Sequence, residues 1–176
     1  MDNLLKPIIE EPEREFHVRE LAKLLGISPM TISRQIKVWK KNGIILQRKL
    51  SNHILIKANT DSRKFKECKI QYNFQLLRNS GLIEFLEDQL NNPAAIVLFG
   101  SFAKGEDTLH SDIDLFVSTP LKKQLDTQKF EEFLNHKIQL FLYSREETQK
   151  MQKNNKELLN NIINGITISG FWEVFS

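Results

Sequence analysis

The chain has 176 residues, of which 27% are charged and 40% hydrophobic, and its formal net charge is +3. A chain of this length can bury a real hydrophobic core as one ordinary domain or as two small ones. Its one cysteine, Cys68, cannot form an internal disulfide, which favours a reducing compartment. The N-terminal residues include no secretory apolar stretch, and no apolar run approaches the roughly 20 residues that cross a bilayer. These features argue against secreted, membrane and fibrous classes, and we expect a cytoplasmic protein.

Charge is distributed unevenly along the chain. Residues 1–92 have a net charge of +5, and residues 93–176 have a net charge of −2. Residues 21–60 contain eight Lys and Arg residues and no Asp or Glu. Such a window is typical of a surface that binds a polyanion, and also of an ordinary solvated basic face. The difference between the halves favours two structural units with different functions.

Two short helices are predicted in the N-terminal half, on either side of a tight turn. The first covers residues 19–25 and is expected to bury Leu21, Leu24 and Leu25. Gly26 is expected to end it, because glycine adopts a left-handed conformation at little cost.

The second helix is expected to start at the Ser-Pro pair of residues 28–29, which supplies a cap and a first helical position. Ile32, Ile36 and Trp39 recur at the helical period and are predicted to face the core. The Asn-Gly pair at residues 42–43 ends this helix. Two helices joined in this way form a helix-turn-helix.

A β-hairpin is predicted next, with strands at residues 44–49 and 53–57 around a turn at 50–52. A helix-turn-helix followed by a hairpin is the element order of a winged helix. Residues 28–37 resemble the recognition helix of bacterial and archaeal winged-helix transcription regulators, and the resemblance covers residues 16–58. The candidate contacts to double-stranded DNA are Ser28, Thr31, Ser33, Arg34, Gln35 and Lys37 on the helix, with Arg48 and Lys49 near the hairpin tip. Some winged helices instead bind a protein or dimerise.

The C-terminal half alternates helices and strands. A long polar helical stretch over residues 60–92 is expected to break at residues 80–81, a Ser-Gly pair. Residues 166–172 either return to a sheet edge or form an interface. The further elements predicted are strands at 94–99, 113–118 and 138–143 and helices at 125–135 and 146–165.

Two carboxylates, separated by Ile113, lie at the start of the middle predicted strand. Asp112 and Asp114 project to one side because alternate residues of a strand share a face. They repel each other unless a cation lies between them, and oxygen ligands of this kind suit Mg²⁺ that also holds a nucleotide phosphate. Gly100 and Ser101 end the preceding strand, where a backbone without a Cβ can approach a phosphate. Lys104 follows in the loop.

Residues 100–106 (Gly-Ser-Phe-Ala-Lys-Gly-Glu) and 111–115 (Ser-Asp-Ile-Asp-Leu) closely resemble the polymerase-beta-like nucleotidyltransferase superfamily, in particular its minimal nucleotidyltransferase branch. This resemblance covers about residues 80–176. It implies that Asp112 and Asp114 hold two Mg²⁺ ions and act as catalytic residues in transferring a nucleotide from a nucleoside triphosphate to an acceptor hydroxyl. It also implies that the phosphates bind to Gly100, Ser101 and Lys104.

We therefore predict an α+β protein of two domains. Residues 1–60 form the winged helix, residues 61–79 a connecting helix, and residues 80–176 a nucleotidyltransferase α/β domain with a mixed sheet. The apolar stripe at residues 65–76 favours a homodimer. The minimal branch includes members that pair with a small helical toxin and add AMP to it, which implies a protein acceptor here.

One position departs from the family pattern. Active members commonly carry a third carboxylate on a later strand, and Gln139 is expected to occupy that position here. An amide carries no charge and would hold one metal less firmly. Two functions therefore stay open. One is a nucleotidyltransferase with an appended DNA-binding domain. The other is a transcription regulator or antitoxin-like protein whose second domain binds a nucleotide or a partner without robust catalysis.

Overall fold

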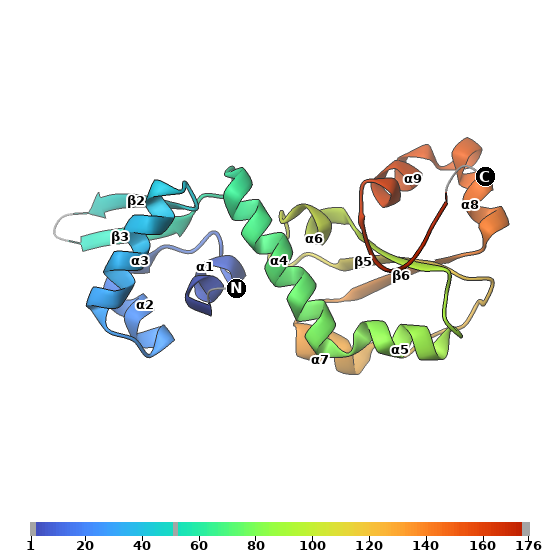
Figure 1. Cartoon of the computed structure of the whole chain (residues 1–176), viewed down its shortest axis with the longest axis horizontal. Helices are drawn as coiled ribbons and strands as arrows, with labels where there is room; N and C mark the ends of the chain where they lie inside the picture. The colour runs from blue at the N-terminus through green and yellow to red at the C-terminus, as the bar shows by residue number, and fades with distance from the viewer. Residues whose placement is uncertain (1–2, 51–52, 174–176) are drawn as a thin grey trace. The chain divides into compact units, whose positions relative to one another are not determined.

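A computed structural model describes residues 3–50 and 53–173 (Figure 1). The chain forms two compact units, and their boundary lies between Tyr72 and Asn73, inside helix α4 (Arg63–Ser80). The connecting helix predicted at residues 61–79 thus corresponds to α4. The first half of α4 adds Phe65 to the hydrophobic core of the first unit, and its second half adds Leu77 to a core of the second.

The first unit combines a three-stranded antiparallel sheet with short helices. Its strands are in the order β1-β3-β2, so that β3 pairs with both neighbours. Residues 51–52 of the predicted turn lie outside the described residues. The 3₁₀-helix η1, helix α1 and strand β1 were not predicted. The elements are η1 (Asn3–Leu5), α1 (Lys6–Glu10), β1 (Phe16–His17), α2 (Val18–Leu25), α3 (Pro29–Lys41), β2 (Ile45–Leu50) and β3 (His53–Ala58).

The turn between α2 and α3 follows the predicted local rules. Gly26 has φ +65° and closes α2 in the left-handed conformation. The Ser28 hydroxyl accepts a hydrogen bond of 3.1 Å from the backbone N–H of Thr31, and Pro29 is the first residue of α3. The predicted inward residues of α3 are buried, with Trp39 only 3% exposed.

The prediction for Leu24 was wrong, since this side chain is 56% exposed. The buried stripe of α2 contains Leu21 and Ala22, with Val18 and Leu25 packed against it. These four positions follow the spacing of one helical face. Leu24 lies on the flank of Leu21 that faces away from Ala22, and it therefore points to solvent.

The second unit is built on a mixed four-stranded sheet with the order β6-β5-β4-β7, which confirms the predicted mixed sheet. The central strands β4 and β5 are antiparallel, β5 and β6 are parallel, and β7 pairs antiparallel with β4 at the edge. Of the two alternatives for residues 166–172, the structure thus places residues 166–170 in the sheet. The strands are β4 (Ala95–Phe99), β5 (Ile113–Ser118), β6 (Ile138–Tyr143) and β7 (Ile166–Gly170).

Helices cover both faces of this sheet (Figure 1). Ile113 and Leu115 face a core with α5 (Leu82–Gln89), α6 (Gly100–Lys104) and α7 (Gln128–Leu134), whereas Phe99 and Phe116 face α8 (Arg145–Asn154) and α9 (Lys156–Ile163). Two details differ from the sequence prediction. The turn at residues 100–104 is a short helix, and the predicted helix at residues 146–165 is divided in two at Asn155, whose side chain caps α9.

The apolar stripe at residues 65–76 is packed within the chain itself. Phe65, Cys68 and Tyr72 belong to the core of the first unit, and Leu76 packs against a core of the second. The stripe therefore gives no support to the predicted homodimer. No helix among the described residues is long and apolar enough to cross a membrane.

Candidate active site

Strand register brings the acidic pair and the glycine-serine turn together at one end of the strands. Phe99, the last residue of β4, lies opposite Asp114 on the antiparallel strand β5. Asp114 in turn lies opposite Gln139 on the parallel strand β6. Asp112 immediately precedes β5, and Gly100 follows β4 directly. Three segments that are distant in sequence thus meet where β4 ends and β5 and β6 begin.

Gly100 and Asp114 lie in direct contact. Gly100 has φ +71°, a conformation that residues with a side chain rarely adopt. A Cβ at this position would overlap the Oδ2 atom of Asp114 and lie 3.3 Å from its Cγ. The backbone conformation therefore favours glycine, and a Cβ here would also require the Asp114 carboxylate to move.

Gln139 is hydrogen-bonded to Asp112. Its side-chain Nε2 donates to Oδ2 of Asp112 at 2.5 Å. An ionised carboxylate only accepts hydrogen bonds, so the amide must present its NH₂ group here rather than its oxygen. The side chain that we expected at the position of a third carboxylate thus contacts one member of the acidic pair.

The surroundings of Asp114 disfavour its charge. Partial burial raises the pKa of Asp114, and the nearby charge of Asp112 raises it further. A cation between the two carboxylates would relieve both effects. The pair is therefore electrostatically prepared to bind a positive ion.

The loop between β4 and β5 is fixed by side chains that the sequence analysis did not single out. The buried amide of Asn73 on α4 donates to Asp107 at 2.7 Å and to the carbonyl of Phe102 at 3.2 Å. His136 contacts the Ser111 carbonyl through Nδ1 at 2.8 Å. The signal that could have revealed Asn73 is a polar residue between apolar positions of a helix. These contacts hold the segment that leads into Asp112.

The predicted phosphate-binding residues lie on α6. Gly100 and Ser101 form its first turn, with Ser101 half-buried, and Lys104 is exposed at its end. Gly105 closes the helix with φ +66°. All three predicted residues therefore lie on the short segment that follows β4, and Gly100 is the one in contact with the acidic pair.

The donor set fits a divalent cation bound together with phosphates. Asp112 and Asp114 supply carboxylate oxygens, and Mg²⁺ in such sites takes one or two carboxylates plus substrate phosphates and water. Among the described residues there is no cluster of three or more His, Cys, Asp or Glu side chains that could hold a metal. Glu131, which is close in sequence to β6, lies on α7 and accepts a hydrogen bond from the Ile138 N–H instead.

A family model described as "Polymerase beta, Nucleotidyltransferase" matches residues 80–170, just over half of the chain. The chain belongs to this family. A search of curated proteins gave no match. The match begins at the last residue of α4 and ends at the last residue of β7, so the nucleotidyltransferase domain contains the whole mixed sheet.

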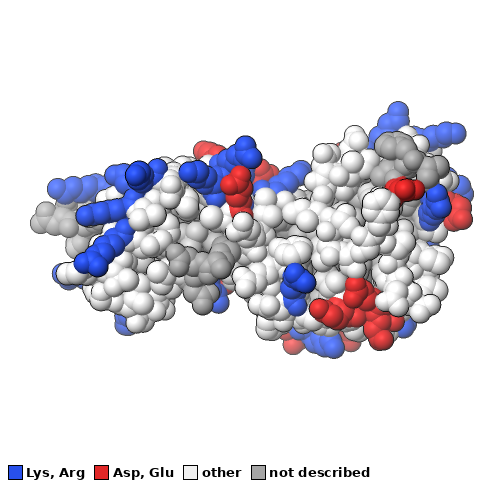
Figure 2. All heavy atoms as spheres, viewed as in Figure 1, with Lys and Arg blue, Asp and Glu red and all other residues white. Residues whose placement is uncertain are grey.

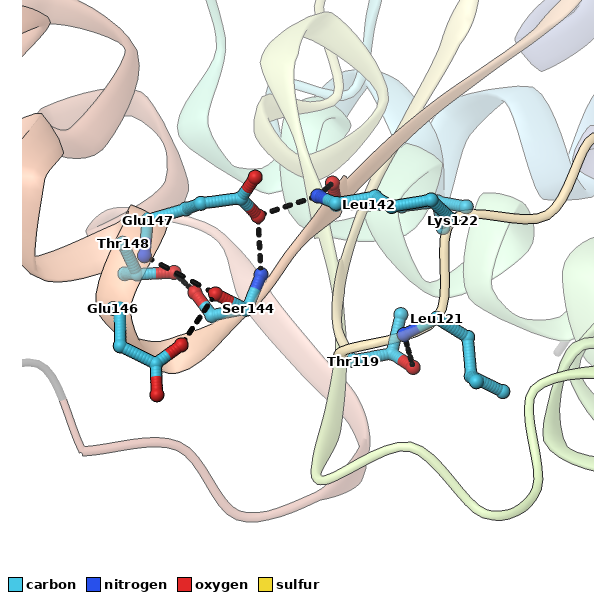
Figure 3. A network of polar contacts seen from close by, with 8 residues as sticks. All are labelled: Thr119, Leu121, Lys122, Leu142, Ser144, Glu146, Glu147 and Thr148. Carbon is cyan, nitrogen blue, oxygen red and sulfur yellow. Dashed lines mark hydrogen bonds and ion pairs between the residues drawn. The ribbon is translucent and has the colours of Figure 1, made fainter.

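A separate polar network lies at the opposite end of the strands, where β5 and β6 end (Figure 3). Lys122 donates to the Leu142 carbonyl at 2.7 Å and is paired with Glu147. Glu147 and Ser144 cap each other at the start of α8, and Thr148 donates to the Ser144 carbonyl. These contacts tie the segment after β5 to the start of α8. A cavity of about 310 Å³ lies nearby, lined by Ser118, Arg145, Thr148 and Trp172 among others.

The candidate DNA-binding residues of the first unit show two environments. Thr31, Arg34 and Lys37 are exposed on α3, while Ser33 is half-buried, and its hydroxyl donates to the Pro29 carbonyl. Figure 2 shows Lys and Arg side chains gathered on the first unit over α3 and the hairpin. Of the remaining candidates, Ser28, Lys49 and the half-buried Gln35 lie on the same two elements.

Arg48 differs from the other candidates because an acidic side chain already binds it. Its guanidinium donates to both carboxylate oxygens of Glu15, each at 2.5 Å. Lys57 is similarly paired with Glu13 at 2.9 Å. Two of the eight cations in the acid-free window are therefore neutralised by acids that precede it in the sequence.

Proposed function

We propose that the chain is a nucleotidyltransferase that moves a nucleoside monophosphate from a triphosphate to an acceptor hydroxyl. The contact between Gly100 and Asp114 carries this proposal. It places a backbone without a side chain directly beside the acidic pair, where a triphosphate and its cation have to meet. Membership of the polymerase beta family supports the same reaction class.

The residues have distinct roles in this proposal. The backbone N–H and hydroxyl of Ser101 donate to phosphate oxygens, Gly100 lets them approach, and Lys104 adds a positive charge. The acceptor oxygen forms a bond to the α-phosphorus, the bond from that phosphorus to the bridging oxygen breaks, and pyrophosphate leaves. The acceptor hydroxyl loses its proton to solvent water.

Asp112 and Asp114 would hold Mg²⁺, which when bound neutralises phosphate charge and aligns the triphosphate. Without a cation these carboxylates would repel the triphosphate. Burial, and after it the charge of Asp112, raises the pKa of Asp114, and a bound cation would offset both effects.

The test is transfer of label from an α-labelled triphosphate in the presence of Mg²⁺. Each of the four triphosphates is offered with candidate acceptors, including a hydroxyl-bearing helical protein of the toxin type. We expect transfer that Asp112→Asn and Asp114→Asn each reduce at least a hundredfold. Asp88→Asn, at an exposed position of α5, is the matched control and should retain activity. Transfer that survives in both site variants would refute the proposal.

A second function is supported by the first unit. We propose that residues 16–58 form a winged helix that binds double-stranded DNA through α3, with Arg34 and Gln35 near base edges and Lys37 near phosphates. The exposed cations of α3 within an acid-free window support it. Regulation by nucleotide binding without turnover is the corresponding alternative for the whole chain, in which case labelled triphosphate binds but is not transferred.

DNA binding is tested by footprinting with the full chain on DNA from the region that precedes its own gene. We expect a protected site, and an affinity that falls steeply as the salt concentration rises. Arg34→Ala should relax sequence preference, whereas Lys37→Ala should weaken binding to all sequences and reduce the salt dependence. An affinity that does not change with salt would contradict the proposal.

A further inference from the structure

We propose that the acidic pair takes one divalent cation rather than two, and that the Gln139 amide acts as a positioning group where a second cation would lie. This inference rests on the proposed nucleotidyl transfer. It concerns the number of ions, and it departs from the two Mg²⁺ ions that the resemblance to the family implies. The hydrogen bond between Gln139 and Asp112 carries it.

The amide occupies the coordination space on one side of Asp112. Gln139 Nε2 lies 2.5 Å from Oδ2 of Asp112 and donates one N–H to that oxygen. Mg²⁺ needs to approach a carboxylate oxygen to roughly 2.0–2.1 Å. The positively polarised NH₂ group would lie against such an ion and repel it. On the side that faces β6, the Oδ2 atom of Asp112 is therefore occupied by the hydrogen bond from Gln139 and does not bind a metal ion.

The other side of the pair suits a single ion. The carboxylate of Asp114 lies next to Gly100, whose backbone is where we propose that phosphates bind. Its carboxylate and the second oxygen of Asp112 leave the remaining positions of an octahedral ion to phosphates and water. Within the described part of the chain, no third carboxylate joins them in a metal-binding cluster. The site thus has ligands for one cation.

Gln139 contributes by fixing Asp112 rather than by touching the ion. An aspartate that is held by a hydrogen bond loses less side-chain freedom when it binds a metal. Because β5 and β6 are parallel with Asp114 opposite Gln139, the sheet itself sets the distance from the amide to Asp112. Gln139 is exposed, so its substitution removes the hydrogen bond without disturbing a core.

The experiment counts bound Mn²⁺ by electron paramagnetic resonance in the presence of a saturating, non-hydrolysable ATP analogue. We expect one ion per complex for the wild-type chain and two for Gln139→Glu, which supplies a third carboxylate of the same shape. Gln139→Leu is the matched control, of similar size but without the amide. It should still bind one ion, with an affinity roughly threefold to tenfold lower because one hydrogen bond is lost.

The outcomes separate this inference from the proposed function. Two ions on the wild-type chain overturn the inference and leave nucleotidyl transfer standing. Wild-type affinity in Gln139→Leu also overturns it, because a positioning group must change affinity when it is removed. Complexes that contain no protein-bound Mn²⁺ overturn both proposals. One ion on the wild-type chain, two on Gln139→Glu and weaker binding in Gln139→Leu support the inference.

Discussion

The backbone of Gly100 contacts the carboxylate of Asp114, so that the end of β4 lies directly against the start of β5. This contact depends on two conditions, one on each residue. Gly100 has to adopt a positive φ, and Asp114 has to keep its carboxylate where a Cβ would otherwise lie. Stability and site geometry therefore both depend on this glycine.

Gly100→Ala should destabilise the fold more than a positive φ alone explains. Gly81 is the matched control, because its φ is +75° and an added Cβ would meet nothing within 4 Å. We expect Gly81→Ala to lower the free energy of unfolding by about 1–2 kcal/mol from backbone strain. Gly100→Ala should cost about 0.5–1.5 kcal/mol more, because the Asp114 carboxylate has to leave its position to make room for the Cβ. Urea unfolding measures both, and equal losses would show that the contact is not tight.

Asp114→Asn should stabilise the metal-free chain at neutral pH. The pKa of Asp114 is raised above its ordinary value of 3.8 in the folded chain, so between these two pKa values the folded state binds more protons than the unfolded state. The free energy of unfolding therefore falls as the pH rises from the ordinary pKa to the raised pKa of Asp114. Above the raised pKa, the ionised carboxylate destabilises the folded chain by its full amount. The carboxylate is partly exposed, and solvent screening keeps the gain below about 1 kcal/mol.

The measurement is urea unfolding in the presence of a chelator, repeated over a pH series. The gain from Asp114→Asn should shrink as the pH falls through the pKa of the folded state. Asp88→Asn, on the exposed surface of α5, should show no such dependence. A gain that stays constant down to the ordinary pKa would contradict the assignment of the effect to ionised Asp114.

Glu15→Gln should strengthen DNA binding if the first unit binds DNA. The carboxylate of Glu15 accepts hydrogen bonds from Nε and Nη2 of Arg48, and the pairing lowers the pKa of Glu15, so the carboxylate stays ionised at neutral pH. Removal of its charge frees Arg48 for a phosphate. We expect an increase in affinity of roughly twofold to fivefold at low salt, measured by fluorescence anisotropy.

Glu67→Gln is the control for Glu15→Gln, since it removes the same charge from α4, where Glu67 pairs with Arg63. Equal gains from both variants would mean that net charge rather than Arg48 is responsible. A second check is Arg48→Ala, which should lower affinity in the wild-type background. In the Glu15→Gln background it should cost more, because Arg48 is then free to contact DNA.

Local features of the fold were predictable because their causes are local. The cap at Ser28, the stop at Gly26 and the buried face of α3 follow from the conformational preferences of neighbouring residues. Leu24 was misassigned because three leucines in one turn and a half fit more than one face. The short helix α1 and the two-residue strand β1 escaped prediction, since β1 exists only through its pairing with β3.

The sequence pattern predicted some of the contacts around the acidic pair and missed others. Alternation along a strand predicts that Asp112 and Asp114 share one side, and in the structure the charge of Asp112 does act on Asp114. It did not identify Asn73, which fixes the loop from a helix that precedes it by about thirty residues. Nor could it show that the Gln139 amide lies against Asp112, because that depends on the parallel register of β5 and β6.

The sequence by itself determined the order of most of the longer helices and strands, the acid-free basic window and the spacing of Gly100, Ser101, Asp112 and Asp114, all of which depend on neighbouring residues. Only the tertiary structure decided that β7 closes the sheet edge, that Gly100 contacts Asp114 and that Glu15 neutralises Arg48. The physical reason is the same in each case. These relationships depend on which distant segments pair and in which register, and side chains far apart in sequence acquire their charge environment only when that pairing is made.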